Sequence, residues 1–171
     1  MADQWVRLEL DVASFDEHHF EKYVTRCRAD GIRLATLAEL GDTPEHRRAL
    51  YELNKECSAD IPERGAFYSY EEYAERRFSV ASYDPRGVVV ALDGDIWVGM
   101  AATSAHGDFV FNEMTGVRAS HRGRGISIAM KTFGMGFVRE CGASKVRTFH
   151  HPLNESAISM NQKMGFTEAR D

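Results

Sequence analysis

The sequence predicts a single α/β (α+β) domain in which helices flank a mixed, mainly antiparallel sheet. Its 171 residues are near the usual size of one domain and suffice to bury one core. Stretches in which apolar and polar residues alternate are interleaved with stretches of helical periodicity. Three of the strand-like stretches follow one another directly, which favours antiparallel pairing. With no internal repeat or linker in the sequence, we expect one structural unit over residues 1–171.

The first 31 residues predict a strand followed by an amphipathic helix. In WVRLELDV (residues 5–12) apolar and polar residues alternate, which is the period of a half-buried strand. Ser14 or Asp16 then caps a helix that Gly31 ends. The apolar residues of this helix recur at helical spacing, at Phe20, Val24 and Cys27. Residues 1–31 therefore form a strand and helix extension ahead of the rest of the domain.

The next part of the chain predicts one strand and two helices. Residues 32–40 read as a strand that runs into a turn. A helix over residues 43–59 begins with Thr43 as its cap and Pro44 at its first position. After a loop, residues 70–80 form a short helix.

The middle of the chain predicts three consecutive strands. GVVVALDGDIWVGMAATSA (residues 87–105) reads as a hairpin with Asp93 and Gly94 at its turn. DFVFNEMTGV (residues 108–117) follows as the third strand.

The last third predicts a helix, a strand and a helix. Apolar residues recur at helical spacing over residues 123–141, and Gly142 closes this helix. SKVRTFHH (residues 144–151) is a further strand, and residues 154–164 form a last helix.

Charge and cysteine content limit the classes of partner. Lys and Arg total 21 against 26 for Asp and Glu, a net charge of −5, so we expect no nucleic acid and no anionic membrane as partners. Cys27, Cys57 and Cys141 are an odd number without C-x-x-C spacing, which indicates reduced thiols and no metal site. The N-terminus has no secretory pattern and the run VVVAL is too short to span a bilayer, so we expect a cytoplasmic protein.

A basic, glycine-containing turn precedes the helix at 123–141. Arg122 and Arg124 alternate with Gly123 and Gly125, so backbone N–H groups can closely approach a ligand at the positive end of a helix. Such a turn suits phosphate, although an ordinary exposed loop is the alternative. The dinucleotide fingerprint would need a third glycine at Ile128, and a P-loop would need Gly-Lys-Ser/Thr at the helix start. A different phosphate ligand is therefore required.

The turn resembles the pyrophosphate loop of the GNAT superfamily of acyl-CoA-dependent N-acyltransferases. That loop reads Gln/Arg-x-x-Gly-x-Gly/Ala after a strand that ends in valine; here the strand ends at Val117, Ser127 stands at the last position, and the loop residues are Arg122, Gly123, Arg124, Gly125, Ile126 and Ser127. The resemblance implies acetyl-CoA as acyl donor, with no metal. The amides of the loop would hold its pyrophosphate, and the backbone of Thr115, Gly116 and Val117 would pair with pantetheine.

A second stretch also resembles this superfamily. Its downstream helix begins with Asn and ends before Gly-Phe, and the matching residues here are Asn154, Ala157, Met164, Gly165 and Phe166. Asn161 stands where the superfamily usually has a tyrosine that protonates the departing CoA thiolate, and Asn at this position resembles the mycothiol-synthase-like branch. The resemblance implies that Asn154 and Asn161 face the pantetheine arm and the thiol. It is specific over residues 108–166 and topological over 32–107.

The resemblance also implies candidate groups for chemistry. Glu113 lies four residues before Val117, where many superfamily members have a carboxylate that deprotonates the acceptor ammonium; the alternative is an outward-facing strand residue. His150 and His151 end the next strand, beside the groove that this fold opens, and are candidates for a catalytic part or simply solvated. A cluster of aromatic residues is core or the wall of the acceptor site: Phe67, Tyr68, Tyr70 and Tyr73.

The resemblance implies an N-acetyltransferase that transfers an acetyl group to a primary amine of a small molecule or peptide by direct attack. The alternatives are a non-catalytic acyl-CoA-binding or regulatory domain, which the absent tyrosine favours, and an interaction module that keeps only the fold.

The two ends of the chain predict one further pairing. Superfamily chains continue beyond Gly-Phe into one or two more strands, whereas this sequence has five residues after Phe166. We expect residues 4–12 to act as a replacement strand near the C-terminal part of the sheet, within one chain or exchanged across a homodimer. The alternative is an edge strand beside residues 32–37.

Overall fold

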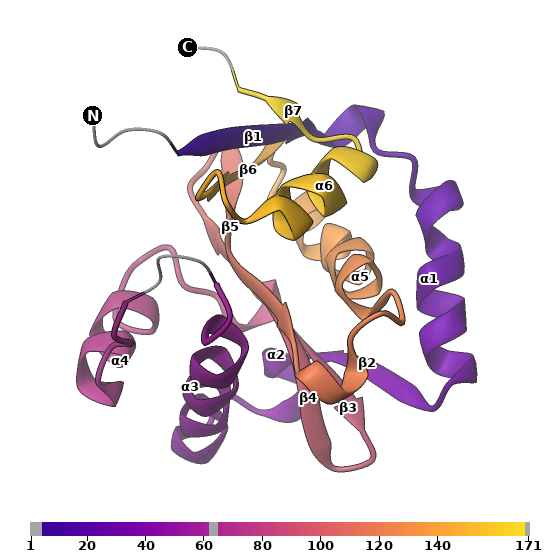
Figure 1. The fold of residues 1–171 in the computed structure, drawn as a ribbon. Helices are drawn as coiled ribbons and strands as arrows, with labels where there is room; N and C mark the ends of the chain where they lie inside the picture. Colours follow the sequence, from indigo (N-terminus) through magenta and orange to yellow (C-terminus); the bar gives the residue numbers. More distant parts are fainter. Residues whose placement is uncertain (1–4, 62–64, 170–171) are drawn as a thin grey trace.

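The computed structural model describes residues 5–61 and 65–169, which form one seven-stranded sheet with helices on both faces (Figure 1). The strand order is β2-β3-β4-β5-β6-β1-β7. The strands are β1 (Val6–Asp11), β2 (Ile32–Thr36), β3 (Val88–Asp93), β4 (Ile96–Ala105), β5 (Phe109–Val117), β6 (Lys145–His150) and β7 (Thr167–Glu168). The helices are α1 (Glu17–Ala29), α2 (Leu37–Leu40), α3 (Pro44–Ser58), α4 (Tyr70–Arg77), α5 (Ile126–Glu140) and α6 (Glu155–Lys163). The mixed, mainly antiparallel sheet confirms the predicted fold class.

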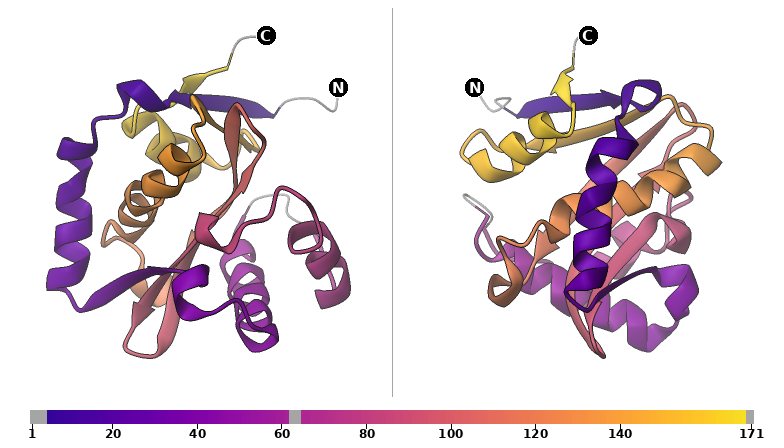
Figure 2. Two further views of the ribbon diagram at one scale, coloured as in Figure 1. Left: turned by 180° about the vertical axis from the view of Figure 1, so that it is seen from behind. Right: turned by 90° about the vertical axis from the view of Figure 1, so that its right-hand side faces the viewer.

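Two clusters of buried apolar side chains cover the two faces of the sheet. One joins α1 and α5 to the sheet, and α1 packs across α5 (Figure 2). The other lies under α2, α3 and α4. The predicted helix face of α1 is confirmed, because Phe20, Val24 and Cys27 are all buried. Asp16 is its cap, accepting a hydrogen bond from the amide of His19.

β1 lies between β6 and β7 and runs antiparallel to both. Val6 pairs with His150 and Asp11 with Lys145, so the whole strand is in register with β6. The predicted pairing of the N-terminal strand with the C-terminal part of the sheet is confirmed within one chain, and pairing with residues 32–37 is wrong. Residue 4, which the prediction also included, lies outside the described residues.

The helix expected over 70–80 ends at Arg77, the helix expected over 123–141 begins at Ile126, and two further boundaries differ from the prediction for identifiable local reasons. The strand expected over 32–40 ends at Thr36, because Thr36 and Glu39 form a capping box that starts α2. The hairpin turn expected at Asp93 and Gly94 lies one residue later, since Asp93 still pairs with Ile96 and Gly94 takes a positive φ of 63°.

The parallel strands β5 and β6 diverge, as the resemblance implied. Phe109–Phe111 is the only part of β5 that pairs with β6, opposite Lys145–Arg147, whereas β5 stays paired with β4 as far as Val117. A register shift between Ala102 and Thr103 in the β4 and β5 ladder accompanies the divergence. Beyond Phe111 one edge of β5 is therefore open. Within the described residues, no helix is both long and apolar enough to cross a membrane.

Candidate active site

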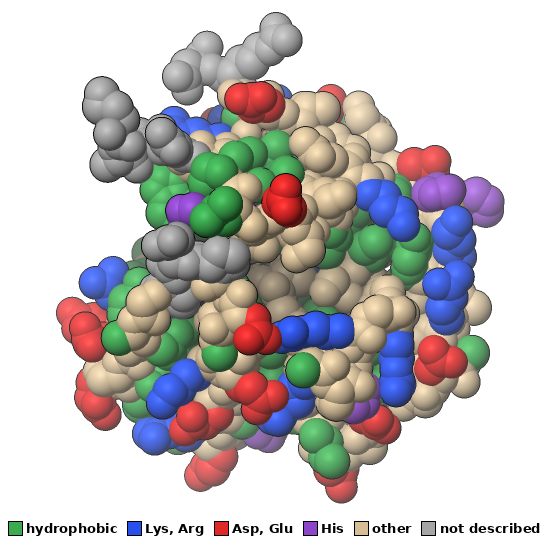
Figure 3. Space-filling model, viewed as in Figure 1, with side chains coloured by type: hydrophobic (Ala, Val, Ile, Leu, Met, Phe, Trp, Pro, Cys, Tyr) green, Lys and Arg blue, Asp and Glu red, His purple; other side chains and the backbone are tan. Residues whose placement is uncertain are grey.

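A cavity of about 320 Å³ lies where β5 and β6 diverge. Its walls come from β5, β6, α5, α6 and the α3 side of the sheet, and Figure 3 shows the surface hollowed between α6 and α3. The predicted site residues that line it are Glu113, Thr115, His150, His151, Asn154 and Asn161. The structure thus brings together the expected base, both asparagines and both histidines.

The glycine turn leads into α5 with the expected open geometry. Gly123 and Gly125 have φ values of 80° and 76°, in the left-handed region that favours glycine. Gly125 is the N-cap residue of α5, and no side chain caps this end. The amides of the first helical turn, at Ile126 and Ser127, have no acceptor inside the helix and lie at the positive end of its dipole. This end of α5 can therefore receive an anion.

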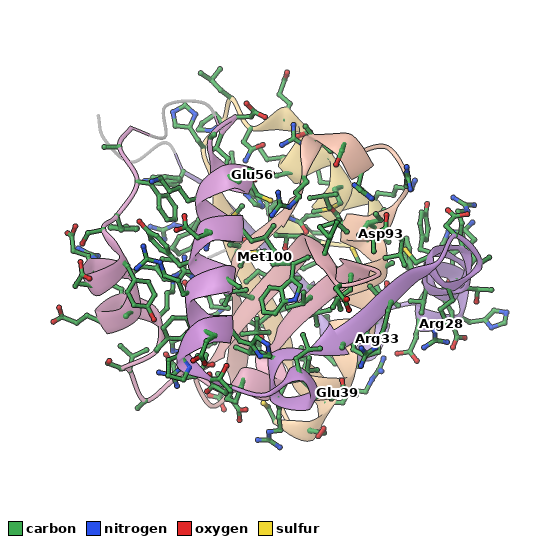
Figure 4. All side chains as sticks on the ribbon, turned by 90° about the horizontal axis from the view of Figure 1, so that it is seen from below. Arg28, Arg33, Glu39, Glu56, Asp93 and Met100 are labelled. Atoms are coloured by element: carbon green, nitrogen blue, oxygen red, sulfur yellow. The ribbon has the colours of Figure 1, made fainter. Side chains whose placement is uncertain are left out.

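Two arginines at the turn are tied to α3 and to the residues that follow it, and neither lines the cavity. Arg122 donates to the carbonyl of Val117 (3.0 Å) and to Asp60 (2.9 Å). Arg118 donates to Glu56 (2.8 Å), which Figure 4 labels on α3. Arg122 therefore holds the turn in place with its side chain, and its backbone amide donates to the carbonyl of Ala119 (3.5 Å), while Arg124 is exposed.

Gly116 lies under α3. A Cβ at this position would lie 2.7 Å from the Cβ of Cys57, so α3 can approach β5 only because this residue is glycine. Gly116 and Val117 do not line the cavity. The pairing expected between their backbone and pantetheine would use the edge of β5 that β6 leaves open. Burial raises the pKa of the Cys57 thiol to about 11. Cys57 is therefore a packing residue.

A group of cations surrounds a tyrosine that packs against the glycine turn. Tyr23 of α1 touches Gly125 so closely that a Cβ there would lie 2.7 Å from its ring. The side chains of Lys22, Arg26 and Lys163 lie 5.8, 5.5 and 5.4 Å from the ring centroid. None of the three has a carboxylate within 4.0 Å in the described parts of the chain. A hydrogen bond with Lys163, aided by the neighbouring charges, lowers the pKa of Tyr23.

Figure 3 shows Lys and Arg side chains along α1 and beside the hollow. Lys22, Arg26 and Lys163 gather around one ring, and their like charges repel one another. The cluster is therefore suited to binding an anion. Sequence reasoning missed it, because nothing in the sequence places α1 next to a turn about a hundred residues further on.

Glu113 is held by two partners. Its Oε1 lies 3.1 Å from Nη1 of Arg77, and its Oε2 accepts a hydrogen bond from Ser104 (2.5 Å). The hydroxyl of Ser104 is in turn 2.8 Å from Nε2 of His106. Glu113 lines the cavity and is not simply an outward-facing strand residue. Its carboxylate is connected through the Ser104 hydroxyl to the exposed imidazole of His106.

Lys131, Asn161 and His150 form a hydrogen-bonded row in the wall of the cavity. Nζ of Lys131 donates to Oδ1 of Asn161 (2.6 Å), and Nδ2 of Asn161 lies 2.7 Å from Nε2 of His150. Burial lowers the pKa of Lys131 to about 7, and burial together with the Lys131 charge lowers that of His150 to about 4. At neutral pH His150 is therefore uncharged and accepts from the amide.

The aromatic cluster divides between core and cavity. Tyr73 is buried and bonds to Asn54, so it belongs to the core, whereas Tyr68 lines the cavity. His151 accepts from the amide of Leu153 at the cavity mouth. Cys141 is a free, partly buried thiol whose pKa burial raises, as expected for a structural cysteine.

Solved structures resemble the fold over nearly the whole chain. A GCN5-related glucosamine N-acetyltransferase region of a fungal multi-domain β-N-acetylglucosaminidase matches 99% of this chain and 20% of that one, with a TM-score of 0.68 and 16% identity. A GCN5-related N-acetyltransferase from Sphaerobacter thermophilus matches 96% of this chain and 48% of that one, with a TM-score of 0.66 and 18% identity. These likenesses establish the fold.

Sequence comparisons point the same way. A mycothiol acetyltransferase from Mycobacterium sp. (strain MCS) is 31% identical over 146 residues, which cover 81% of this chain and 46% of the relative. One from Streptomyces scabiei (strain 87.22) is 27% identical over 115 residues, covering 66% of this chain and 37% of the relative. The chain thus spans less than half the length of these curated relatives. The profile of the acetyltransferase (GNAT) family matches residues 47–166. The chain therefore belongs to the acetyltransferase (GNAT) family.

Proposed function

We propose that this protein transfers an acetyl group from acetyl-CoA to a primary amine of a small molecule or peptide. One observation carries the proposal: the cavity where β5 and β6 diverge is lined by Thr115 of β5 and Lys131 of α5, and the uncapped N-terminus of α5 lies between these two residues in the chain. A single ligand can therefore place its diphosphate on the glycine turn and extend its thioester into the cavity.

In this proposal the acyl donor lies along the open edge of β5. The amides of residues 122–127 hold the pyrophosphate, and the backbone of 115–117 pairs with the pantetheine arm. Asn154 and Asn161, which line the cavity, face the arm and the sulfur. The cations around Tyr23 receive the adenosine 3′-phosphate.

The chemistry is direct attack of a neutral amine on the thioester carbonyl. Glu113 takes up the proton that the acceptor ammonium must lose. Ser104 and His106 then pass a proton from Glu113 toward the surface. The amine nitrogen then forms a bond to the acetyl carbon while the C–S bond breaks and its electron pair goes to sulfur. No covalent enzyme intermediate is needed, because the cavity brings both reactants together.

The acceptor is assigned only as a class. Relatives are named for mycothiol, and solved structures of similar fold include an aminoglycoside N-acetyltransferase and a ribosomal-protein-S18-alanine N-acetyltransferase from Escherichia coli. We therefore propose an amine carried by a small molecule or a peptide end. We also propose that residues 1–171 form a single domain with 1–31 as its N-terminal extension, which the core shared by β1, α1 and α5 supports. Free thiols agree with a cytoplasmic location. Because β1 pairs with β6 and β7 of its own chain, a homodimer would form without exchange of this strand.

Release of CoA tests the proposal. The protein is incubated with acetyl-CoA and a panel of amino sugars, polyamines and peptides, and free thiol and acetylated product are measured. Release that depends on both protein and amine supports the proposal. Protection by acetyl-CoA in a thermal shift assay without release from any amine would indicate the non-catalytic acyl-CoA-binding domain instead.

A pair of glycine substitutions tests the turn. Gly123→Ala is expected to weaken acetyl-CoA binding at least about tenfold, because a Cβ intrudes where the diphosphate approaches the backbone. Gly107→Ala is the matched control, since φ is 80° at Gly123 and 81° at Gly107 and neither Cβ meets an atom within 4 Å. Gly125 is a poorer probe because its Cβ would strike Tyr23. Titration calorimetry measures the affinity; equal affinities for both variants would contradict the assignment.

A charge deletion tests the cation cluster. Lys22→Ala combined with Arg26→Ala is expected to weaken CoA binding about tenfold and to leave 3′-dephospho-CoA binding unchanged, because only CoA carries the 3′-phosphate. Arg28→Ala is the control, since Arg28 lies on α1 (Figure 4) and is exposed away from Tyr23. An equal loss for both ligands would assign the cations to another phosphate.

A further inference from the structure

Lys131 is buried in the wall of the cavity, although lysine usually extends into solvent. It lies in the second turn of α5, and only 9% of the residue is exposed. Its Nζ contacts two groups: Oδ1 of Asn161 at 2.6 Å and the ring of Phe166, 4.8 Å from the centroid. In the described residues no carboxylate lies within 4.0 Å of this ammonium. A buried, unpaired ammonium is unfavourable, so packing alone does not account for it.

The neighbours of Lys131 fix which group can give up a proton. Oδ1 of Asn161 accepts from the ammonium, so the amide must present Nδ2 to His150, and Nε2 of His150 must carry a lone pair. His150 is therefore neutral and acts as an acceptor. Glu113, on the β5 side of the cavity, accepts hydrogen bonds from Arg77 and Ser104. The ammonium of Lys131 is the proton donor in this row.

The proton affinity of Lys131 suits this role. Burial lowers its pKa to about 7, so that it is partly protonated near neutral pH and releases its proton readily. His150 from β6 is the titratable group on the other side of Asn161, and the charge of Lys131 helps to lower its pKa. Asn161 from α6 has no acidic proton of its own.

We propose that Lys131 protonates the sulfur of CoA as the thioester C–S bond breaks. The electron pair of that bond goes to sulfur, the sulfur takes a proton from Nζ, and Lys131 is left as a neutral amine that regains a proton from water. Its positive charge also stabilises the thiolate before the proton moves. This inference rests on the proposed acetyl transfer. It assigns the acid of the reaction to Lys131, because the side chain of Asn161 is an amide without an acidic proton.

The test compares Lys131→Met and Lys131→Arg with the wild type and with Lys55→Met, an exposed lysine of α3. Methionine removes the charge, and arginine keeps the charge but does not release a proton near neutral pH. Values of kcat and KM are measured from pH 5.5 to 9.5, and acetyl-CoA affinity by calorimetry. Because the acid must be protonated, kcat of the wild type should fall as pH rises above about 7.

Both Lys131 variants are expected to lower kcat at least about tenfold at pH 6.5 and to lose this alkaline decline, with acetyl-CoA affinity within about twofold of the wild type. Lys55→Met should match the wild type. An unchanged kcat and pH profile in Lys131→Met, or full activity in Lys131→Arg, would overturn proton donation while leaving acetyl transfer intact. Absence of CoA release by the wild type itself would overturn both proposals.

Discussion

Replacing Glu113 by Gln is expected to lower kcat about a hundredfold at neutral pH without weakening acetyl-CoA binding. Glutamine keeps the size of the side chain and its contact with Ser104, but it cannot take up a proton. The acceptor would then remain an ammonium, whose nitrogen has no lone pair for attack on the thioester. Initial rates of CoA release and calorimetric affinities measure the two quantities separately.

Glu155→Gln is the control for this substitution. Glu155 begins α6 at the rim of the same region but is exposed and lies outside the cavity lining. It should keep wild-type kcat, so that a loss specific to Glu113 reflects proton transfer. A Glu113→Gln variant as active as the wild type would assign the carboxylate to holding Arg77, the ion pair that joins α4 to β5.

Local signals in the sequence were sufficient for most elements of the fold. Alternation identified β1, and a cap, helical periodicity and a closing glycine identified α1 and α5, because these features act over a few residues. The incorrect end of β2 also had a local signal. Thr36 and Glu39 have the spacing of a capping box, which outweighs the apolar character of Leu37 and Leu40.

The candidate site was only partly predictable. Motif spacing located the glycine turn, Glu113 and Asn161, and these remain predictions as binding and catalytic residues. The partners that define their chemistry are distant in sequence: Arg77 is 36 residues from Glu113, and Lys131 is 30 residues from Asn161. No periodicity encodes such pairs, because the packing of α4 on β5 and of α6 on α5 creates them. Lys131 itself sits among apolar helix positions, which was the available signal.

Removal of β1 is expected to have the largest effect on stability. β1 separates β6 from β7, and Leu8 and Leu10 are only 1% and 2% exposed in the core shared with α1 and α5. Without it, β6 would lose its antiparallel neighbour, and β6 carries His150 at the cavity. An uncovered edge above exposed core residues also favours aggregation.

Deleting residues 1–12 is therefore expected to abolish cooperative unfolding or cause aggregation, as measured by thermal and urea denaturation with light scattering. Leu8→Ala tests the same contact more gently and should lower the free energy of unfolding by about 3 kcal/mol, because it leaves a cavity between the sheet and α5. Ile96→Ala, at a strand residue that is 62% exposed, should change it by less than about 0.5 kcal/mol. A deletion variant that unfolds with the midpoint and cooperativity of the full chain would show that β1 covers the sheet without stabilising it.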